Sequence, residues 1–205
     1  LTKIDLNEEA NGIVPSIHWK RAIKGVSWYP GDTVITSIGQ GFMLATPLQM
    51  ANATATLSQH GMRFRPHLLI KTVNSDNDEV KMYKPIQEEH IKLNDEANWI
   101  LVSEAMHSVL TSNEGTGYRF GRNPPYPVAG KTGTAQVHSG QQYAKTRYED
   151  IPEALRDNSL FIAFSPVESP DIAITVVVEN DSSASVVARQ ILDTYYKIHP
   201  MKTNS

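Results

Sequence analysis

VAGKTGTAQV, residues 128–137, is the stretch that decides the fold of this chain. Its valines, threonines and small residues, with no helical repeat of apolar positions, predict an extended strand. Successive side chains of a strand point to opposite faces. Thr132, Thr134 and Gln136 would therefore share one face, and Lys131 would lie on the other.

A strand of this composition is suited to hold a carboxylate. Gly133 has no side chain to keep a ligand away from the backbone between Thr132 and Thr134. The two hydroxyls and the free backbone N–H groups can donate hydrogen bonds, and Lys131 supplies a positive charge. The pattern indicates one wall of an anion-binding cleft.

The same residues also match the end of a phosphate-binding loop. That motif requires a glycine where this chain has Pro125, and a helix that begins at the Lys-Thr pair. The residues after Thr132 favour a strand instead, so a nucleotide site is not expected. The plain alternative is an ordinary strand with a turn glycine, because Lys-Thr-Gly is a short signal on its own.

Composition narrows the class of protein. The 205 residues suit one domain or most of one, and a hydrophobic content of 40 % is enough for a core. A net charge of −3 gives no support to a nucleic-acid surface. There is no cysteine, no apolar run of membrane-span length and no signal peptide. Because the chain begins with Leu1, we expect it to be a piece of a longer protein.

Neither a metal site nor a carboxylate pair is apparent. The seven histidines are scattered, and the closest pair, His60 and His67, lacks the spacing of metal ligands on one face. The carboxylates form no recognisable pair of the kind that glycosidases use. No metal and no cofactor is therefore predicted.

The first part of the chain is expected to be mostly irregular. Residues 1–31 carry recurring Asn, Gly and Pro, with Trp19 and Trp28 packing this segment against the body. Residues 32–41 suggest a tight turn at their glycines. A buried helix should begin with Thr46 as its N-cap and end at Gly61.

Further elements follow from local signals. Residues 65–73 read as a strand, 74–78 as its turn and 80–83 as the return strand. A helix is expected from Asn94, followed by a loop over 111–127. Its inner stripe would consist of Trp99, Val102, Met106 and Val109.

The last third completes the fold class. Residues 138–158 read as a long hairpin connection with a short helical stretch near 152–156, and strands follow at 160–164 and 172–178. A closing helix is expected over 182–197, with Val186, Ile191, Leu192 and Tyr195 near its inner face. Helices, then three hairpin-connected strands, then a helix indicate an α+β fold with an antiparallel sheet flanked by helices.

Several short motifs together resemble the transpeptidase domain of class B penicillin-binding proteins. They are KTG on its strand, SIGQG at 37–41 and TPLQ at 46–49. The fuller match is to the penicillin-binding protein 2 branch, the enzymes of cell elongation, through WK at 19–20, GDTV at 31–34, LRD at 155–157 and FSP at 164–166. This resemblance implies the C-terminal part of a β-lactamase/transpeptidase-like fold.

The resemblance also implies a reaction. Enzymes of this family attack the D-Ala-D-Ala end of a peptidoglycan stem peptide with a serine, form an acyl-enzyme and transfer it to an amine of a neighbouring stem; β-lactams trap the same serine. Lys131 and Thr134 would then be catalytic, with the Thr134 N–H as one oxyanion-hole donor. Thr132, Gly133 and Thr134 would bind the substrate carboxylate.

Two motifs of the family are missing. No serine in the chain has a lysine three positions later, and Ser-x-Asn occurs only at Ser75-Asp76-Asn77, which reads as a hairpin turn. We expect residues 1–205 to be the C-terminal part of the domain, inactive alone, with both motifs upstream. The alternatives are a non-catalytic penicillin-sensor or pseudo-enzyme domain, and a D,D-carboxypeptidase or β-lactamase relative.

The family implies partners and a location. They are D-Ala-D-Ala stem peptides, β-lactams, the rest of the same transpeptidase domain and a membrane cell-wall polymerase of the elongation complex. The location would be the periplasmic side of a bacterial inner membrane, with the anchor outside this chain. In the family, the strand at 172–178 pairs with one from the start of the domain, so an unpaired edge would favour a homodimer here.

Overall fold

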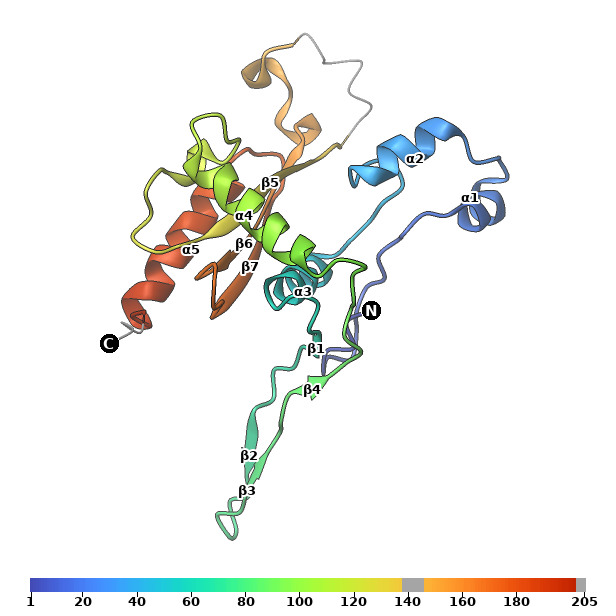
Figure 1. The fold of residues 1–205 in the computed structure, drawn as a ribbon. Helices are drawn as coiled ribbons and strands as arrows, with labels where there is room; N and C mark the ends of the chain where they lie inside the picture. The colour runs from blue at the N-terminus through green and yellow to red at the C-terminus, as the bar shows by residue number, and fades with distance from the viewer. Residues whose placement is uncertain (138–145, 202–205) are drawn as a thin grey trace.

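The computed structural model describes residues 1–137 and 146–201, and a three-stranded antiparallel sheet lies at its centre (Figure 1). The strands are β5 (Ala129–Ala135), β6 (Asn158–Ser165) and β7 (Ile172–Val178), in the order β5-β6-β7. One face is covered by helix α5 (Ala184–Ile198), and the other by α3 (Pro47–Ser58) and α4 (Ala97–Thr111). The α+β class and the antiparallel sheet are as the sequence predicts.

Alternation along β6 builds a core on each face of the sheet. Phe161 and Ala163 belong to the larger cluster, which includes Leu192 of α5. Phe164 points to the opposite face and packs with Met106 of α4. All these side chains are buried, so β6 is apolar on both faces, as a central strand must be.

Helix α5 packs through a different stripe from the expected one. Leu192 is fully buried as predicted, but Val186 and Ile191 are 39 % and 41 % exposed. Ala184 and Ala188 lie one turn apart on the Leu192 face and are buried instead. Their short side chains let the helix approach the sheet closely, which the bulkier branched residues would prevent.

Local signals locate α3 correctly and α4 less well. Thr46 caps α3: its hydroxyl accepts a hydrogen bond from the Gln49 N–H, and the Gln49 side chain accepts one from the Thr46 N–H. In α4, Met106 is buried as expected, whereas Val102 is 41 % exposed. The buried stripe of α4 also contains Ser103 and Leu110.

The strand expected over residues 65–73 is divided in two. The structure has β1 (Phe64–Arg65) and β2 (Lys71–Val73), which pair with β4 (Ile86–Gln87) and β3 (Val80–Met82) respectively. Between them, the Asp5 carboxylate accepts the N–H groups of Leu68 and Leu69 at 2.8 and 3.0 Å. These two N–H groups are therefore not available for strand pairing. The turn at Ser75-Asp76-Asn77 is present as expected.

Two helices occupy segments that were expected to be irregular. They are α1 (Ile17–Lys24) and α2 (Pro30–Ser37). Asp32 joins them: its carboxylate accepts the Tyr29 N–H at 2.7 Å and meets the buried Lys20 Nζ at 2.5 Å. The Lys20 ammonium also lies 4.7 Å from the Tyr29 ring centre.

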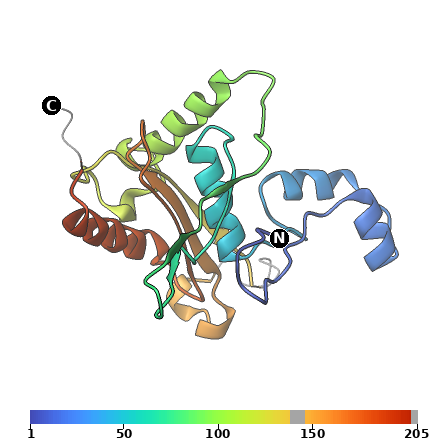
Figure 2. The ribbon, with the colours of Figure 1, turned by 90° about the horizontal axis from the view of Figure 1, so that it is seen from below.

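These helices belong to one excursion of the chain, residues 13–44, which we call the 13–44 arm. Ile13 and Leu44 form an isolated antiparallel bridge at its base, with nitrogen-to-oxygen distances of 2.7 and 3.0 Å. Figures 1 and 2 show α1 and α2 standing apart from the sheet and its helices. Trp19 packs on Phe42 within the arm, with ring centres 5.4 Å apart, rather than against the body.

The remaining connections contain short turns of 3-10 helix. They are Tyr118–Phe120, Tyr148–Asp150 and Glu153–Leu155, and the last lies where a short helical stretch was expected. Part of the expected hairpin connection, 138–145, lies outside the described residues. In the part of the chain that is described, no helix is both long enough and apolar enough to cross a membrane.

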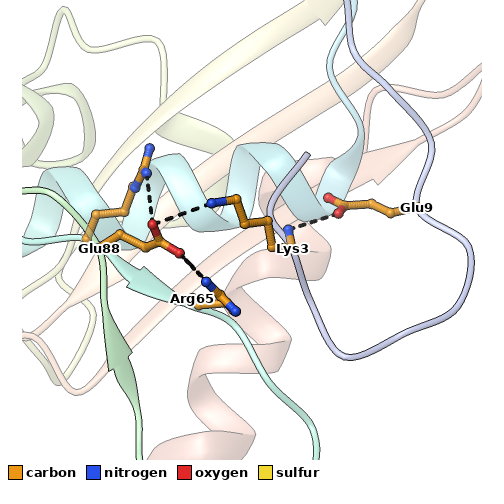
Figure 3. Close-up of polar contacts among 5 residues, drawn as sticks. Lys3, Glu9, Arg65 and Glu88 are labelled. Atoms are coloured by element: carbon orange, nitrogen blue, oxygen red, sulfur yellow. Dashed lines mark hydrogen bonds and ion pairs between the residues drawn. The ribbon is translucent and has the colours of Figure 1, made fainter.

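Glu88 joins the N-terminal segment to the small β1–β4 sheet (Figure 3). Its carboxylate accepts from Arg65 Nε and Nη2 at 3.1 and 2.9 Å, and Lys3 and Arg63 lie at 3.7 and 3.6 Å. The hydrogen bonds from Arg65, together with the charges of Lys3 and Arg63, hold the pKa of Glu88 below its ordinary value. The carboxylate thus stays charged to lower pH in the folded protein than in the unfolded chain.

We predict a pH-dependent cost for Glu88→Gln. Because the folded-state pKa of Glu88 is lowered, its stabilisation is present above the ordinary glutamate pKa of 4.5 and is lost as the pH falls through the folded value. The variant should melt below the wild type at pH 7, and the gap should close in acid. Thermal unfolding from pH 3 to 7 measures this, with the exposed neighbour Glu89→Gln as control. A gap that does not change with pH would contradict the prediction.

Candidate functional site

The outer edge of β5 is the centre of the candidate site. β5 is the first strand of the sheet, and among the described strands it pairs only with β6. The Thr134 carbonyl points away from β6, because it accepts a hydrogen bond from the Gln40 side chain at 2.6 Å. The N–H and C=O of one strand residue point to the same side. The Thr134 N–H is therefore also directed outward, where a ligand can reach it.

The side-chain alternation predicted from the sequence is present in β5. Lys131 lies opposite Ile162, whose side chain belongs to the face under α3 and α4. Thr132 lies opposite Phe161, on the α5 face. The strand ends at Ala135, so Gln136 lies beyond it rather than on it.

Lys131 and Thr132 meet at the open edge. The exposed Lys131 Nζ donates to the Thr132 carbonyl at 2.8 Å and lies 3.3 Å from the Thr132 hydroxyl. The Thr132 hydroxyl is also 3.0 Å from the hydroxyl of Thr116. Two hydroxyls and an ammonium group therefore meet at the open edge of the strand, although Lys131 and Thr132 start from opposite faces, and they form a donor set suited to a carboxylate.

The two glycines of the motif have different surroundings. A Cβ on Gly130 would lie 2.8 Å from the Phe161 ring and 3.0 Å from the Ile162 carbonyl, so glycine is needed for close packing. Gly133 is exposed, and its nearest neighbour would be Leu160 Cβ at 3.3 Å. The exposure of Gly133 agrees with a backbone that a ligand can approach.

A groove of about 610 Å³ runs between β5 and the end of the 13–44 arm. One wall is the strand itself, and the other is the glycine-rich turn around Gln40. Apolar side chains form much of the floor, so a ligand held at the edge of β5 would also contact apolar surface. These side chains are Ile38, Met43, Leu44, Met50, Leu160 and Ile162.

A second cavity, of about 690 Å³, lies elsewhere in the molecule. It is lined by His60 and His107 together with Glu104 and Glu168. His107 Nδ1 is already bound to the Val128 carbonyl at 2.8 Å. Within residues 1–137 and 146–201, no group of three His, Asp or Glu side chains is arranged to hold a metal ion.

Sequence reasoning missed two residues of the site, Thr116 and Gln40. Thr116 stands between two glycines that pack tightly on the end of α4: a Cβ on Gly115 would clash with the Val109 carbonyl. Gln40 likewise stands between two glycines. A polar residue flanked by glycines is the signal that could have identified both, although it does not reveal that either reaches β5.

Comparison with known proteins identifies the family. The family model described as the penicillin binding protein transpeptidase domain matches residues 1–197. This chain belongs to that family.

Its relatives narrow the assignment. Peptidoglycan D,D-transpeptidase MrdA of Salmonella typhimurium is 39 % identical over 198 residues, which are 94 % of this chain and 31 % of the relative. The Acinetobacter baumannii protein of the same name is 38 % identical over 195 residues, 94 % of this chain and 28 % of that protein. This chain therefore spans about a third of the length of these curated relatives.

Solved structures agree with this assignment. Pseudomonas aeruginosa PBP2 in complex with WCK 5153 is 36 % identical, with a TM-score of 0.72, over 98 % of this chain and 40 % of that one. Helicobacter pylori PBP2 in complex with MreC is 29 % identical, with a TM-score of 0.76, over 97 % of this chain and 34 % of that one. The resemblance inferred from the motifs is confirmed.

We predict that Gly130→Ala destabilises the fold. The new methyl group would press on the Phe161 ring and on the Ile162 carbonyl, so overpacking should cost about 1–3 kcal/mol. Gly31→Ala in α2 is the matched control, because no heavy atom lies within 4 Å of its added Cβ. Denaturant unfolding of both variants measures the difference. Equal free energies of unfolding for Gly130→Ala and Gly31→Ala would contradict the prediction and show that the Phe161 ring moves away from the added methyl group.

Proposed function

We propose that this chain is the C-terminal part of the transpeptidase domain of a peptidoglycan D,D-transpeptidase and forms one wall of its cleft. The observation that supports this most is the open edge of β5, where Lys131, Thr132 and the outward Thr134 N–H gather. The curated relatives named D,D-transpeptidase point to the same activity. The nucleophilic serine and its lysine would lie upstream of Leu1.

The reaction requires hydrogen-bond donors beside the nucleophile that stabilise a developing negative charge. A serine Oγ attacks the carbonyl carbon between the two D-alanines, and a tetrahedral oxyanion forms. The C–N bond then breaks, the departing D-alanine takes up a proton, and an acyl-serine ester remains. Attack by the amine of a neighbouring stem forms the new amide and releases the serine. A β-lactam acylates the same serine by opening its ring, so the leaving amine stays attached to the acyl group.

The residues of β5 fit three roles in this scheme. The outward Thr134 N–H would be one oxyanion donor, and such a donor typically contributes about 3–4 kcal/mol to barrier lowering. The Thr132 and Thr134 hydroxyls would hold the terminal carboxylate, with Gly133 leaving room for it. Lys131 would supply positive potential at the same edge. No cofactor is needed for acyl transfer of this kind.

The proposed partners extend to the cell-wall machinery. One structure that this chain resembles is that of a Helicobacter pylori PBP2 bound to MreC. We propose stem peptides as substrates, β-lactams as inhibitors, and an elongation complex with a membrane polymerase as the setting. The chain would then be periplasmic, in a protein anchored in the inner membrane through a segment outside residues 1–205.

Intact-mass spectrometry after incubation with a reactive penicillin tests this proposal. The full-length gene product should gain one adduct, and this chain alone should gain none, because no serine here is followed by lysine at the third position. An adduct on this chain would overturn the placement of the nucleophile upstream. No adduct on a folded full-length protein would instead favour the penicillin-sensor or pseudo-enzyme alternative, whereas release of free D-alanine without cross-linking would favour a carboxypeptidase.

The role of Lys131 can be tested in the same full-length protein. Lys131→Met should slow acylation by about tenfold or more, since a unit charge a few ångströms from an anionic ligand contributes more than 1 kcal/mol at the effective dielectric of a protein surface. Lys197→Met, in the last turn of α5, is the matched control. Equal acylation rates for the two variants would exclude a role of Lys131 in binding or catalysis.

The outer edge of β7 supports a proposal about assembly. Among the described strands, β7 pairs only with β6, so its other edge is open. In the full-length protein this edge would pair with another strand of the same domain. In the isolated chain, a second copy would take that place, because an apolar unpaired edge favours strand addition.

Light scattering over a concentration series measures this self-association. The isolated chain should approach twice its monomer mass, and Val177→Lys on β7 should shift it toward the monomer, because lysine on an edge strand opposes pairing. Val186→Lys is the control, since Val186 on α5 has nearly the same exposure, 39 % against 36 %. A monomeric mass at the highest concentration would refute the dimer.

A further inference from the structure

Gln40 makes a contact with β5 that the proposed roles do not use. Its Nε2 donates to the Thr134 carbonyl at 2.6 Å across 94 residues of sequence. The segment that follows α2 turns back toward the end of β5 (Figure 1). The contact therefore links the 13–44 arm to the residue whose N–H faces the cleft.

The turn that carries Gln40 packs on the end of α2. Gly39 and Gly41 both have φ of +75°, a conformation that other residues adopt only with strain. The Gln40 N–H donates to the Ile35 carbonyl at 3.1 Å, and a Cβ on Gly41 would lie 2.9 Å from the Ile35 side chain. The backbone on both sides of Gln40 is thus fixed on the end of α2, which limits the directions its side chain can take.

The 13–44 arm is itself braced at several points. The Ile13–Leu44 bridge closes its base, and the Lys20–Asp32 ion pair joins α1 to α2. Lys20 is 5 % exposed, so this pair is shielded from solvent on the lysine side. Gln40 is therefore held by a structured element and not by a free loop.

Thr134 is a residue whose orientation needs such support. It pairs with Ser159 one position before β5 ends at Ala135, so the ladder beyond it is short. Backbone groups near a strand end open more readily than those in its middle. The Thr134 carbonyl belongs to the peptide group that follows, and the Thr134 N–H to the one that precedes. In an extended strand residue both groups point to the same side, so a hydrogen bond that holds the carbonyl outward also favours an outward N–H.

We propose that Gln40 is a positioning residue that aims the Thr134 N–H into the cleft. The inference rests on the proposed transpeptidase function, in which that N–H stabilises the oxyanion. A carbonyl oxygen has two lone pairs, so the Gln40 contact leaves one free for an extended peptide lying along β5. Gln40 acts on the reacting atoms only through Thr134 and does not itself touch them.

A positioning role predicts a specific kinetic signature. Gln40→Met keeps the length of the side chain and removes its donor without adding charge. In the full-length protein, the limiting rate of acylation by a chromogenic β-lactam should fall about three- to tenfold, the effect of losing one hydrogen bond that acts in the transition state. The dissociation constant of the preceding complex should stay within about twofold, and the melting temperature should change little.

Gln40→Glu is the second variant and makes the effect larger. Its carboxylate is isosteric with the amide but repels the Thr134 carbonyl, so the limiting rate should fall below that of Gln40→Met. Repulsion of the anionic ligand should also weaken the preceding complex. Gln190→Met and Gln190→Glu serve as matched controls, because Gln190 is exposed on α5, and both should acylate as the wild type does.

The outcomes separate this proposal from the function it rests on. If the wild type is acylated and Gln40→Met is acylated at the same limiting rate, the positioning role is overturned and the proposed function stands. A lowered melting temperature with an unchanged rate would show a merely structural tether, which also overturns it. A folded wild type that is never acylated would overturn the proposed function and this inference together. If Gln40→Met or Gln40→Glu does not unfold cooperatively, the limiting rate of acylation of the other variant decides whether Gln40 has a positioning role.

Discussion

The register between β5 and β6 is the constraint on which the rest of this structure depends. Lys131 lies opposite Ile162, and Thr132 opposite Phe161. A slip by one residue would exchange the two faces of β5, placing the lysine in the core under α5 and the threonine hydroxyl under α3. The buried Phe161 side chain prevents that slip, because a lysine would have to take the place of Thr132 opposite its ring. Core packing therefore decides which donors reach the open edge.

The open edge is assembled from segments that lie far apart in the sequence. β5 supplies the backbone and Lys131, the loop after α4 supplies Thr116, and the 13–44 arm supplies Gln40. Each of the last two residues is delivered by a glycine-containing turn packed on a helix end. The strand thus provides the donors, while the helices around it determine where those donors can act.

Elements with local signals were predictable from the sequence, and elements held by distant contacts were not. Thr46 and its neighbours define the start of α3 by themselves, and the bounds of β7 agree with the expected 172–178. Helix α2 was missed because its β-branched residues disfavour a helix, whereas Asp32 stabilises it through Lys20, twelve positions away. For the same reason the sequence indicated the threonines of β5, but not their contacts with Thr116 and Gln40.

The Ile13–Leu44 bridge has a consequence for how such a protein can change over time. Because the two ends of the 13–44 arm are held together at its base, its interior does not determine where the flanking chain goes. Lengthening a closed loop costs little conformational entropy. Insertions between these two residues should therefore be tolerated by the sheet, and natural variation in length should concentrate there, provided that the turn carrying Gln40 still returns to β5.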